Sequence, residues 1–350
     1  MDSEKTFPQG EVAMKFRIVF VGLDYHQAWV QVCVMDRRGN VLVNRRCPND
    51  REVIVALVHQ YSRRVQASIE ACCGAAELAE ELIDHYGWSV DLAHPGYVAR
   101  MKQGPDKTDF GDARLLADLE RVGYLPRVWL APEPIRELRR VVRFRQQLAA
   151  QRRDVKLRMR ALLRDGRVTR PAAKPWSVPW MQWLKTTEEV SKQSRWILDR
   201  HLKRLKELLV EIRVVEKRLA QMTKEDKVVE QLLCQKGIGL ITAVTLRAEI
   251  GRFDRFRTGK QLSRFCGLSP RNASSGERQA DAGLVKAGNR QLRVVLIETA
   301  HRLARYEHRW IVMKAKMRHR GKPGSLIAAA IANRWVRWLY HQMQTVGQAA

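Results

Sequence analysis

The sequence predicts an α/β domain over residues 1–130, a long helical coiled-coil segment over residues 131–225 and a mostly α-helical domain over residues 226–350. Three observations lead to this fold class. Short apolar runs alternate with amphipathic stretches through the first 125 residues, as in mixed α/β domains. Two later stretches repeat apolar residues every seven positions, which is typical of a coiled coil. The remaining residues form helical patterns separated by turns that contain glycine.

The first domain is expected to fold in the order βββ-α-β-α-β-α. Its predicted strands are residues 16–25, 28–36, 39–46, 65–71 and 88–95. Its predicted helices are residues 49–64, 75–87 and 108–123. Gly87 is placed to end the second helix, and Thr108 is placed to cap the third.

The middle segment is expected to contain two long helices separated by a Pro- and Trp-rich break at residues 170–183. The positions of the seven-residue repeat are Val141, Leu148, Val155 and Leu162 in the first helix, then Leu198, Leu202, Leu205, Leu209, Ile212 and Leu219 in the second. Periodicity alone equally allows an ordinary helical hairpin. Residues 136–165 hold eleven Lys and Arg against three acids, so contact with a phosphate backbone is expected in either case.

The charge balance points to a polyanionic partner. The chain has 64 Lys and Arg against 37 Asp and Glu, a formal net charge of +27 at pH 7. Such a field concentrates nucleic acid, with a membrane surface as the rival partner. No apolar run approaches the roughly 18 residues that a membrane-spanning helix needs. The polar, acidic N-terminus lacks the apolar core of a signal peptide, so we expect a cytoplasmic protein.

The cysteines do not indicate a metal site. They are Cys33, Cys47, Cys72, Cys73, Cys234 and Cys266, and none forms a CxxC pair with zinc-binding spacing. In a reducing cytoplasm they are expected to be small core residues.

Four carboxylates stand out by their positions in the first domain. Asp24 ends the first predicted strand and Glu70 ends the fourth. Asp109 and Asp112 lie three apart in the last helix and so share one face, and Asp106 could replace either of them. Taken singly, each acid could equally serve a turn or the helix dipole. Taken with the strand order, the acids match the ribonuclease H-like (RuvC-like) fold, in which such positions converge on one cleft.

A cleft with four carboxylates requires cations, because clustered anions repel one another. Oxygen ligands suit Mg²⁺ or Mn²⁺. Two such ions about 4 Å apart can clamp both oxygens of a phosphodiester during displacement. The acids therefore predict a metal site that acts on phosphodiesters.

A second candidate site lies in residues 269–293, SPRNASSGERQADAGLVKAGNRQLR. Ser275 stands between Ser274 and Gly276, and the stretch has no histidine to activate a serine. By itself, a Ser-Gly pair marks a turn, and the surrounding cations make a solvated basic face. The cations that could neutralise phosphate are Arg271, Arg278, Lys286, Arg290 and Arg293.

These motifs together resemble those of transposases of the insertion-sequence-110 type and of the related pilin-gene-inverting recombinases. VGLD at 21–24, IEACCG at 69–74 and KTDFGDARLLA at 107–117 resemble the family's DEDD signature. KGIGLITAVTLRAEIG, FRTGKQLSRFCGLSPRNASSG and KAGNRQLR resemble its C-terminal transposase domain. The resemblance runs from roughly residue 17 to residue 340, and the middle segment matches only in being helical. The two cysteines of EACCG replace a residue that is usually smaller.

The resemblance implies a site-specific DNA recombinase of a mobile element that acts on donor and target DNA. It implies Asp24, Glu70, Asp109 and Asp112 as catalytic acids that bind Mg²⁺ or Mn²⁺, and Ser275 as the nucleophile, with Ser274 as the neighbouring alternative. It also implies a homo-oligomer, a dimer or tetramer, in which the acids of one subunit meet the serine of another. Some members are guided by a structured RNA that the element encodes. A bacterial protein of this kind would be associated with the nucleoid.

Two other classes of protein stay open on the residues alone. A RuvC-like hydrolytic nuclease would use the acids with water as the nucleophile. A non-catalytic scaffold would only bind nucleic acid. Ser275→Ala separates a recombinase from a nuclease, and Asp24→Ala separates either enzyme from a scaffold.

Overall fold

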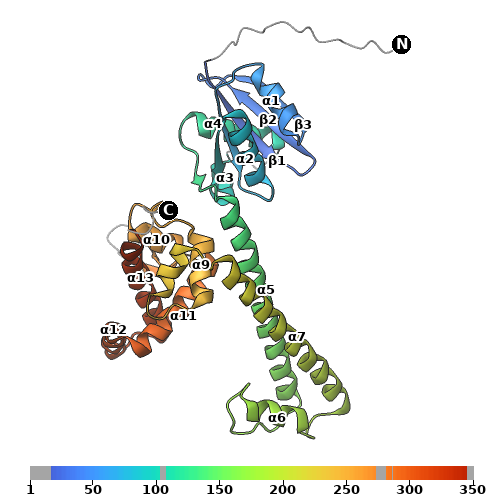
Figure 1. Ribbon diagram of the computed structural model, residues 1–350, viewed down its shortest axis with the longest axis vertical. Helices are drawn as coiled ribbons and strands as arrows, with labels where there is room; N and C mark the ends of the chain where they lie inside the picture. Colours follow the sequence, from blue (N-terminus) through green and yellow to red (C-terminus); the bar gives the residue numbers. More distant parts are fainter. Residues whose placement is uncertain (1–16, 103–107, 273–280, 286, 345–350) are drawn as a thin grey trace. The chain divides into compact units, whose positions relative to one another are not determined.

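The computed structural model describes residues 17–102, 108–272, 281–285 and 287–344. The chain divides into two compact units at the boundary between Ala131 and Pro132, and Figure 1 labels most of the helices and three of the strands. The finer division into domains over 1–130, 131–225 and 226–350 stays a prediction. In the part of the chain that is described, no helix is both long enough and apolar enough to cross a bilayer.

The first unit is built on a six-stranded mixed sheet in the order β3-β2-β1-β4-β5-β6. Its strands are β1 (Val19–Tyr25), β2 (Trp29–Met35), β3 (Val41–Pro48), β4 (Val65–Glu70), β5 (Ser89–Ala93) and β6 (Arg127–Val128). β1, β4 and β5 run parallel, while β2, β3 and β6 pair antiparallel with their neighbours. The first five strands confirm the predicted ones. The two-residue β6 was not predicted, because so short a strand has no alternation to detect.

Helices cover both faces of this sheet (Figure 1). α1 (Arg51–His59) and α2 (Ala75–Tyr86) share a core with Val21 and the other odd-numbered residues of β1. α4 (Asp109–Arg121) packs on the opposite face, where alternate strand residues point. As predicted, Gly87 ends α2 in a left-handed conformation, and Thr108 caps α4 by accepting a hydrogen bond from the N–H of Gly111. A short helix, α3 (Pro95–Met101), was not predicted.

The second unit begins with a pair of long helices. α5 (Glu133–Asp165) and α7 (Lys192–Met222) lie side by side (Figure 1), and α6 (Val178–Thr186) lies between them in the chain. The predicted break therefore contains a helix, whose Pro179 is tolerated because it lies in the first turn. The buried members of the predicted repeat are Leu148, Val155, Leu198, Leu205, Ile212 and Leu219.

The remaining members of the repeat depart from the predicted seam. Val141, Leu162 and Leu202 are only partly buried, and Leu209 is 36% exposed. Val142, Met159 and Leu163 are buried instead in α5, and Leu208 and Val215 in α7. A helix with 3.6 residues per turn drifts away from a strict seven-residue repeat, so the buried stripe moves round each helix.

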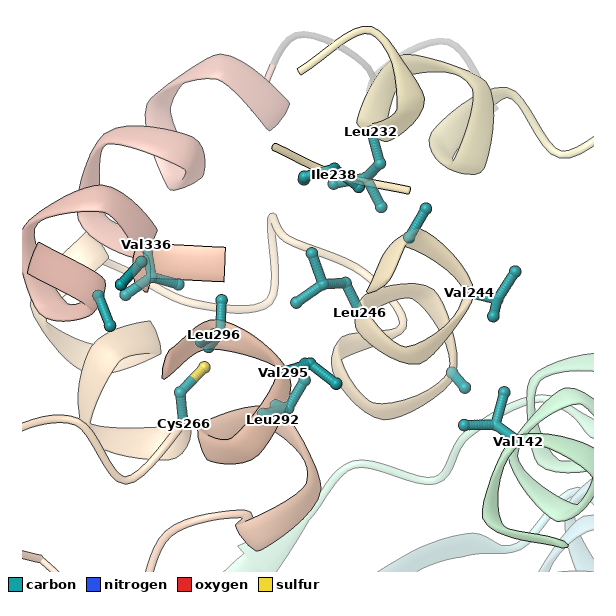
Figure 2. Packing of buried hydrophobic residues seen from close by; sticks show 14 of the residues in the cluster. Val142, Leu232, Ile238, Val244, Leu246, Cys266, Leu292, Val295, Leu296 and Val336 are labelled. Carbon is teal, nitrogen blue, oxygen red and sulfur yellow. The ribbon is translucent and has the colours of Figure 1, made fainter. Parts of the chain in front are cut away.

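The rest of the second unit is mostly helical. Its elements are α8 (Lys227–Leu233), α9 (Leu240–Ile250), α10 (Gly259–Phe265), the hairpin of β7 (Pro270–Asn272) and β8 (Asp281–Leu284), α11 (Arg290–Tyr306), α12 (His308–His319) and α13 (Gly324–Met343). Figure 2 shows Leu246, Leu296 and Val336 of α9, α11 and α13 in its core, with Val142 of α5 beside α9. The core therefore joins the long helices to the C-terminal helices.

The cysteines divide into two groups. Cys33, Cys47 and Cys266 are buried, as expected for small core residues. Cys72, Cys73 and Cys234 are exposed, so the prediction that they belong to the core is wrong. Cys72 and Cys73 follow β4 in the turn before α2, where the chain leaves the sheet and is open to solvent.

Candidate active site

A glycine in β1 brings the start of α4 against the end of the strand. A Cβ on Gly22 would lie 1.9 Å from the carbonyl oxygen of Ala113 and 2.5 Å from the nitrogen of Ala117. Only a residue without a side chain allows this approach. Asp24 is two residues further along β1, and Asp109 is the first residue of α4. The close packing at Gly22 therefore places the two acids at the same edge of the sheet.

Two polar side chains on neighbouring strands hold the first turn of α4. Asn44 of β3 donates from Nδ2 to the carbonyl oxygen of Phe110 at 2.9 Å. Gln31 of β2 donates from Nε2 to Oδ1 of Asn44 at 2.8 Å and so sets its orientation. Gln31 is also the residue that faces Asp24 across the β1–β2 ladder. The sheet thus fixes α4 at the point where Asp109 begins it.

His26 joins the two acids. Its Nε2 lies 3.3 Å from Oδ2 of Asp24 and 3.6 Å from Oδ1 of Asp109. One ligand atom from each of the three residues lies within 4.8 Å of the others. The ring of His26 stacks on Trp29, with 3.6 Å between the centroids. Sequence reasoning missed His26, although a residue two positions after Asp24 in an extended chain points to the same face.

Two cations of the protein balance the charge of the acids. Lys102 Nζ lies 2.6 Å from Oδ1 of Asp112, whose side chain is 14% exposed. Arg46 Nη2 lies 3.4 Å from Oδ2 of Asp109, and its guanidinium also lies 3.7 Å from the ring centroid of Trp29. Neither cation was singled out in the sequence. Lys102 ends its helix outside the motif, and Arg46 reaches Asp109 only through the pairing of β3 with β2.

The surroundings of Asp24 disfavour its charged form. Burial is the main cause that raises its pKa above the ordinary value of 3.8. His26 opposes this shift, while the negative charges of Asp112 and Asp109 add to it. Three of the four predicted acids therefore interact electrostatically.

Glu70 lies at the same edge by strand register. Leu23 pairs with Ile69 in the parallel β1–β4 ladder, so Asp24 and Glu70 are the next residues on neighbouring strands. Partial loss of water around the thiol is the main cause that raises the pKa of Cys72, and the charges of Glu70 and Asp24 add to it. All four predicted acids thus lie at the edge formed by β1, β4 and the start of α4, but the ligand atoms grouped within 4.8 Å belong only to Asp24, Asp109 and His26 among the described residues.

The donor set fits a hard divalent cation. Its carboxylate oxygens are the ligands that Mg²⁺ and Mn²⁺ prefer, and the imidazole of His26 would suit Mn²⁺ better than Mg²⁺. Burial is the main cause that raises the pKa of Asp24, with repulsion from Asp112 and Asp109 as smaller causes, and a bound cation would oppose both. Asp106, the alternative acid, lies outside the described residues.

The second candidate site is only partly described. Ser274, Ser275, Arg278 and Lys286 lie outside the described residues. Arg271 is exposed in β7, and Arg290 is exposed at the first position of α11. Arg293 donates from Nη1 to the carbonyl oxygen of Val285 at 3.3 Å, so it also holds the chain that follows β8. Phosphate binding by these arginines stays a prediction.

A buried carboxylate supports the chain after the hairpin. Glu249 of α9 accepts from Arg143 at 2.9 and 3.0 Å and from Nδ2 of Asn289 at 2.8 Å. Asn289 in turn caps α11, because its Oδ1 accepts from the N–H groups of Gln291 and Leu292. The sequence motifs contain Glu249 and Asn289 but give no sign that the two meet.

Two family models match the chain on either side of the long helices. A model described as "Transposase", for DEDD transposases of the IS110 type, matches residues 21–166. A model described as "Transposase IS116/IS110/IS902 family" matches residues 229–315. The first range contains Asp24, Glu70, Asp109 and Asp112, and the second contains Ser275.

Curated relatives match nearly the whole chain. A "Probable family 20 transposase" of Pseudomonas aeruginosa is 27% identical over 91% of this chain and 95% of its own length. The transposase for insertion sequence element IS1111A of Coxiella burnetii is 25% identical over 92% of this chain and 89% of its own. The transposase for IS1328 of Yersinia enterocolitica is 24% identical over 94% and 98%.

Proposed function

Since the chain belongs to the IS116/IS110/IS902 family of transposases, we propose that it is a site-specific recombinase that moves a mobile element between donor and target DNA. Transposases are enzymes that act on DNA. The observation that carries the proposal is the meeting of Asp24, His26 and Asp109, whose ligand atoms lie within 4.8 Å inside the matched range.

In the first unit, we assign Asp24, Glu70, Asp109 and Asp112 as the residues that hold Mg²⁺ or Mn²⁺, within a ribonuclease H-like (RuvC-like) fold. The parallel β1, β4 and β5, the antiparallel β2 and β3, and helices on both faces support that fold. When bound, the cation would stabilise charge on the phosphate and favour ionisation of the attacking hydroxyl. Lys102 and Arg46 hold Asp112 and Asp109 in place by ion pairs.

In the second unit, we assign Ser275 as the nucleophile. Its Oγ forms a bond to phosphorus, the bond from phosphorus to the 3′ oxygen breaks, and the serine proton ends on that oxygen as a 3′ hydroxyl. The phosphoserine keeps the energy of the phosphodiester, so the reverse attack by a 3′ hydroxyl rejoins strands without ATP. Serine needs activation, and the acids of the partner subunit would supply it through an interface.

The assembly follows from the same proposal. The long helices α5 and α7 form a coiled-coil arm, and the active protein is a homo-oligomer, a dimer or tetramer. A structured RNA of the element selects the DNA sites, and the protein works at the nucleoid. The charge of +27 supports binding of both nucleic acids.

Strand exchange by Ser275→Ala tests the proposal. We expect loss of exchange by at least about 10³-fold, since no other group replaces the nucleophile, with DNA binding unchanged. The same loss is expected for Asp24→Ala. A covalent adduct trapped on a nicked suicide substrate should yield a labelled peptide that contains Ser275.

Each alternative has its own outcome. If Ser275→Ala still exchanges strands, or the labelled peptide lacks Ser275, the nucleophile is assigned wrongly. If Ser275→Ala still cleaves DNA while Asp24→Ala does not, the protein is a hydrolytic nuclease. Ser274→Ala is the matched control and should keep activity.

A further inference from the structure

The cations of α5 divide into two groups along the helix. Arg143 pairs with Glu249 and Arg145 pairs with Glu216, so these arginines serve the structure. Further along, some arginine side chains make no hydrogen bond or ion pair with any residue in the described ranges. These are Arg158, Arg160 and Arg164 of α5, and Arg167 just after it. The end of α5 thus carries cations whose charge nothing in the described chain neutralises.

A groove of about 780 Å³ lies between this end of α5 and the neighbouring turns of α7. Three of the unpaired arginines, Arg158, Arg164 and Arg167, line it, and His201 of α7 faces them. Asp165 is the only acid of the lining, and Ile197 adds an exposed apolar side chain. The groove therefore combines a clear excess of positive charge with space for a ligand.

The helix dipole does not account for this arrangement. Cations near the last turn stabilise a helix C-terminus, which applies to Arg164. Arg158 lies further back, and His201 is ten residues into α7. Burial, and then the charge of Arg158, lower the pKa of His201 below its ordinary value of 6.5. The groove thus concentrates mutually repelling cations, which an anionic ligand would relieve.

We propose that this groove binds the phosphodiester backbone of duplex DNA. Guanidinium groups form bidentate hydrogen bonds with phosphate oxygens. Three arginines line this groove. Contacts from these guanidinium groups to phosphate oxygens would position DNA without selecting its sequence. The inference rests on the proposed function in that DNA is the substrate. It adds a DNA-binding site on the α5–α7 helix pair, which is remote in sequence from both the acids and Ser275.

Arg158→Ala and Arg160→Ala form a matched pair. Both remove one unpaired arginine from the same helix, but residues two apart on a helix point about 200° away from each other, and only Arg158 lines the groove. Affinity of the full chain for labelled duplex DNA is measured by fluorescence anisotropy across a salt series in EDTA. For Arg158→Ala we expect roughly 5- to 10-fold weaker binding and a salt slope reduced by about 1. Arg160→Ala should change affinity less than about twofold.

Several results would overturn the groove assignment. Equal effects of the two variants would mean that only net charge matters, and no effect of Arg158→Ala would mean that DNA lies elsewhere. Weaker binding of duplex RNA alone would assign the groove to RNA. A changed molar mass by light scattering, with DNA affinity unchanged, would assign it to a second copy of the chain.

Further controls separate folding and chemistry from binding. Arg158→Lys keeps the charge but loses the planar guanidinium group and its bidentate contacts, so it should bind DNA with intermediate affinity. Unchanged melting of both alanine variants by circular dichroism excludes misfolding, since both sites are exposed. Ser275→Ala should keep full DNA affinity while losing strand exchange. Failure of the groove assignment therefore leaves the proposed chemistry standing, and the reverse also holds.

Discussion

At the scale of single residues, the carboxylate of Asp24 is held in a place that disfavours its charge. Burial is the largest cause of its raised pKa, and Asp112 and Asp109 add to it. Asp24→Asn removes the charge and keeps the shape. Without a divalent ion at neutral pH, we expect the variant to be more stable by about 1 kcal/mol, or roughly 2–4 °C in melting temperature.

The pH dependence follows from the direction of the shift. The folded state holds the proton of Asp24 more tightly than the unfolded state, so the penalty is absent below the ordinary pKa of 3.8 and complete above the raised pKa. The advantage of Asp24→Asn should shrink as the pH falls toward 3.8. Mn²⁺ should stabilise the natural protein and not the variant, which reverses their order. Equal melting temperatures of the natural protein and Asp24→Asn at all pH values would contradict this account. Asp84→Asn on α2 is the control, and it should show no such pH-dependent difference.

The acids could be predicted, and their partners could not. Asp24 and Glu70 end strands, and Asp109 and Asp112 share a helix face, so the strand order together with these positions predicts that they lie at one edge of the sheet, while their role as metal ligands stays a prediction. Arg46 and Lys102 reach the site through strand pairing and through the end of α3, which no local pattern reveals. The alternation of the strand would have placed His26 beside Asp24, but a lone histidine gives little reason to look.

At the scale of elements, the packing of α4 on β1 holds the site together. A methyl group at Gly22 would lie 1.9 Å from the backbone of Ala113, which no side-chain movement can relieve. Gly22→Ala should therefore push α4 away from β1, destabilise the protein by about 3 kcal/mol and abolish its stabilisation by Mn²⁺. Gly239→Ala is the control, since a Cβ there meets nothing within 4 Å. Undiminished stabilisation by Mn²⁺ in Gly22→Ala would show that the α4 acids are not ligands.

The elements themselves were predicted where they are long and regular. The first five strands of the sheet and the helices α2 and α4 follow the apolar patterns of the sequence closely, whereas α1 is shorter than the helix predicted over residues 49–64. α6 lies in a stretch that proline and tryptophan marked as a break, yet burial of Trp180 and Leu184 stabilises it as a helix. The buried seam of α5 and α7 moved off the strict repeat for the geometric reason that each helix turns every 3.6 residues.

At the scale of the whole molecule, two cores predict two unfolding transitions. The clusters around Val21 and Phe20 belong to the first unit, and the cluster around Leu246 and Leu296 belongs to the second. A separate core gives each unit its own cooperativity. Because the proposed metal ligands all lie in the first unit and the groove residues in the second, calorimetry should show Mn²⁺ raising one transition and duplex DNA raising the other.

The size of these shifts follows from ligand binding to the folded unit. A ligand at about 100 times its dissociation constant adds about 2.7 kcal/mol to stability. Asp24→Asn should abolish the rise in melting temperature that Mn²⁺ causes and leave the rise caused by duplex DNA intact. Arg158→Ala should reduce the DNA shift alone. A single transition that both ligands raise would instead mean that the two units unfold as one body, and that the acids and the groove are energetically coupled even before DNA is cut.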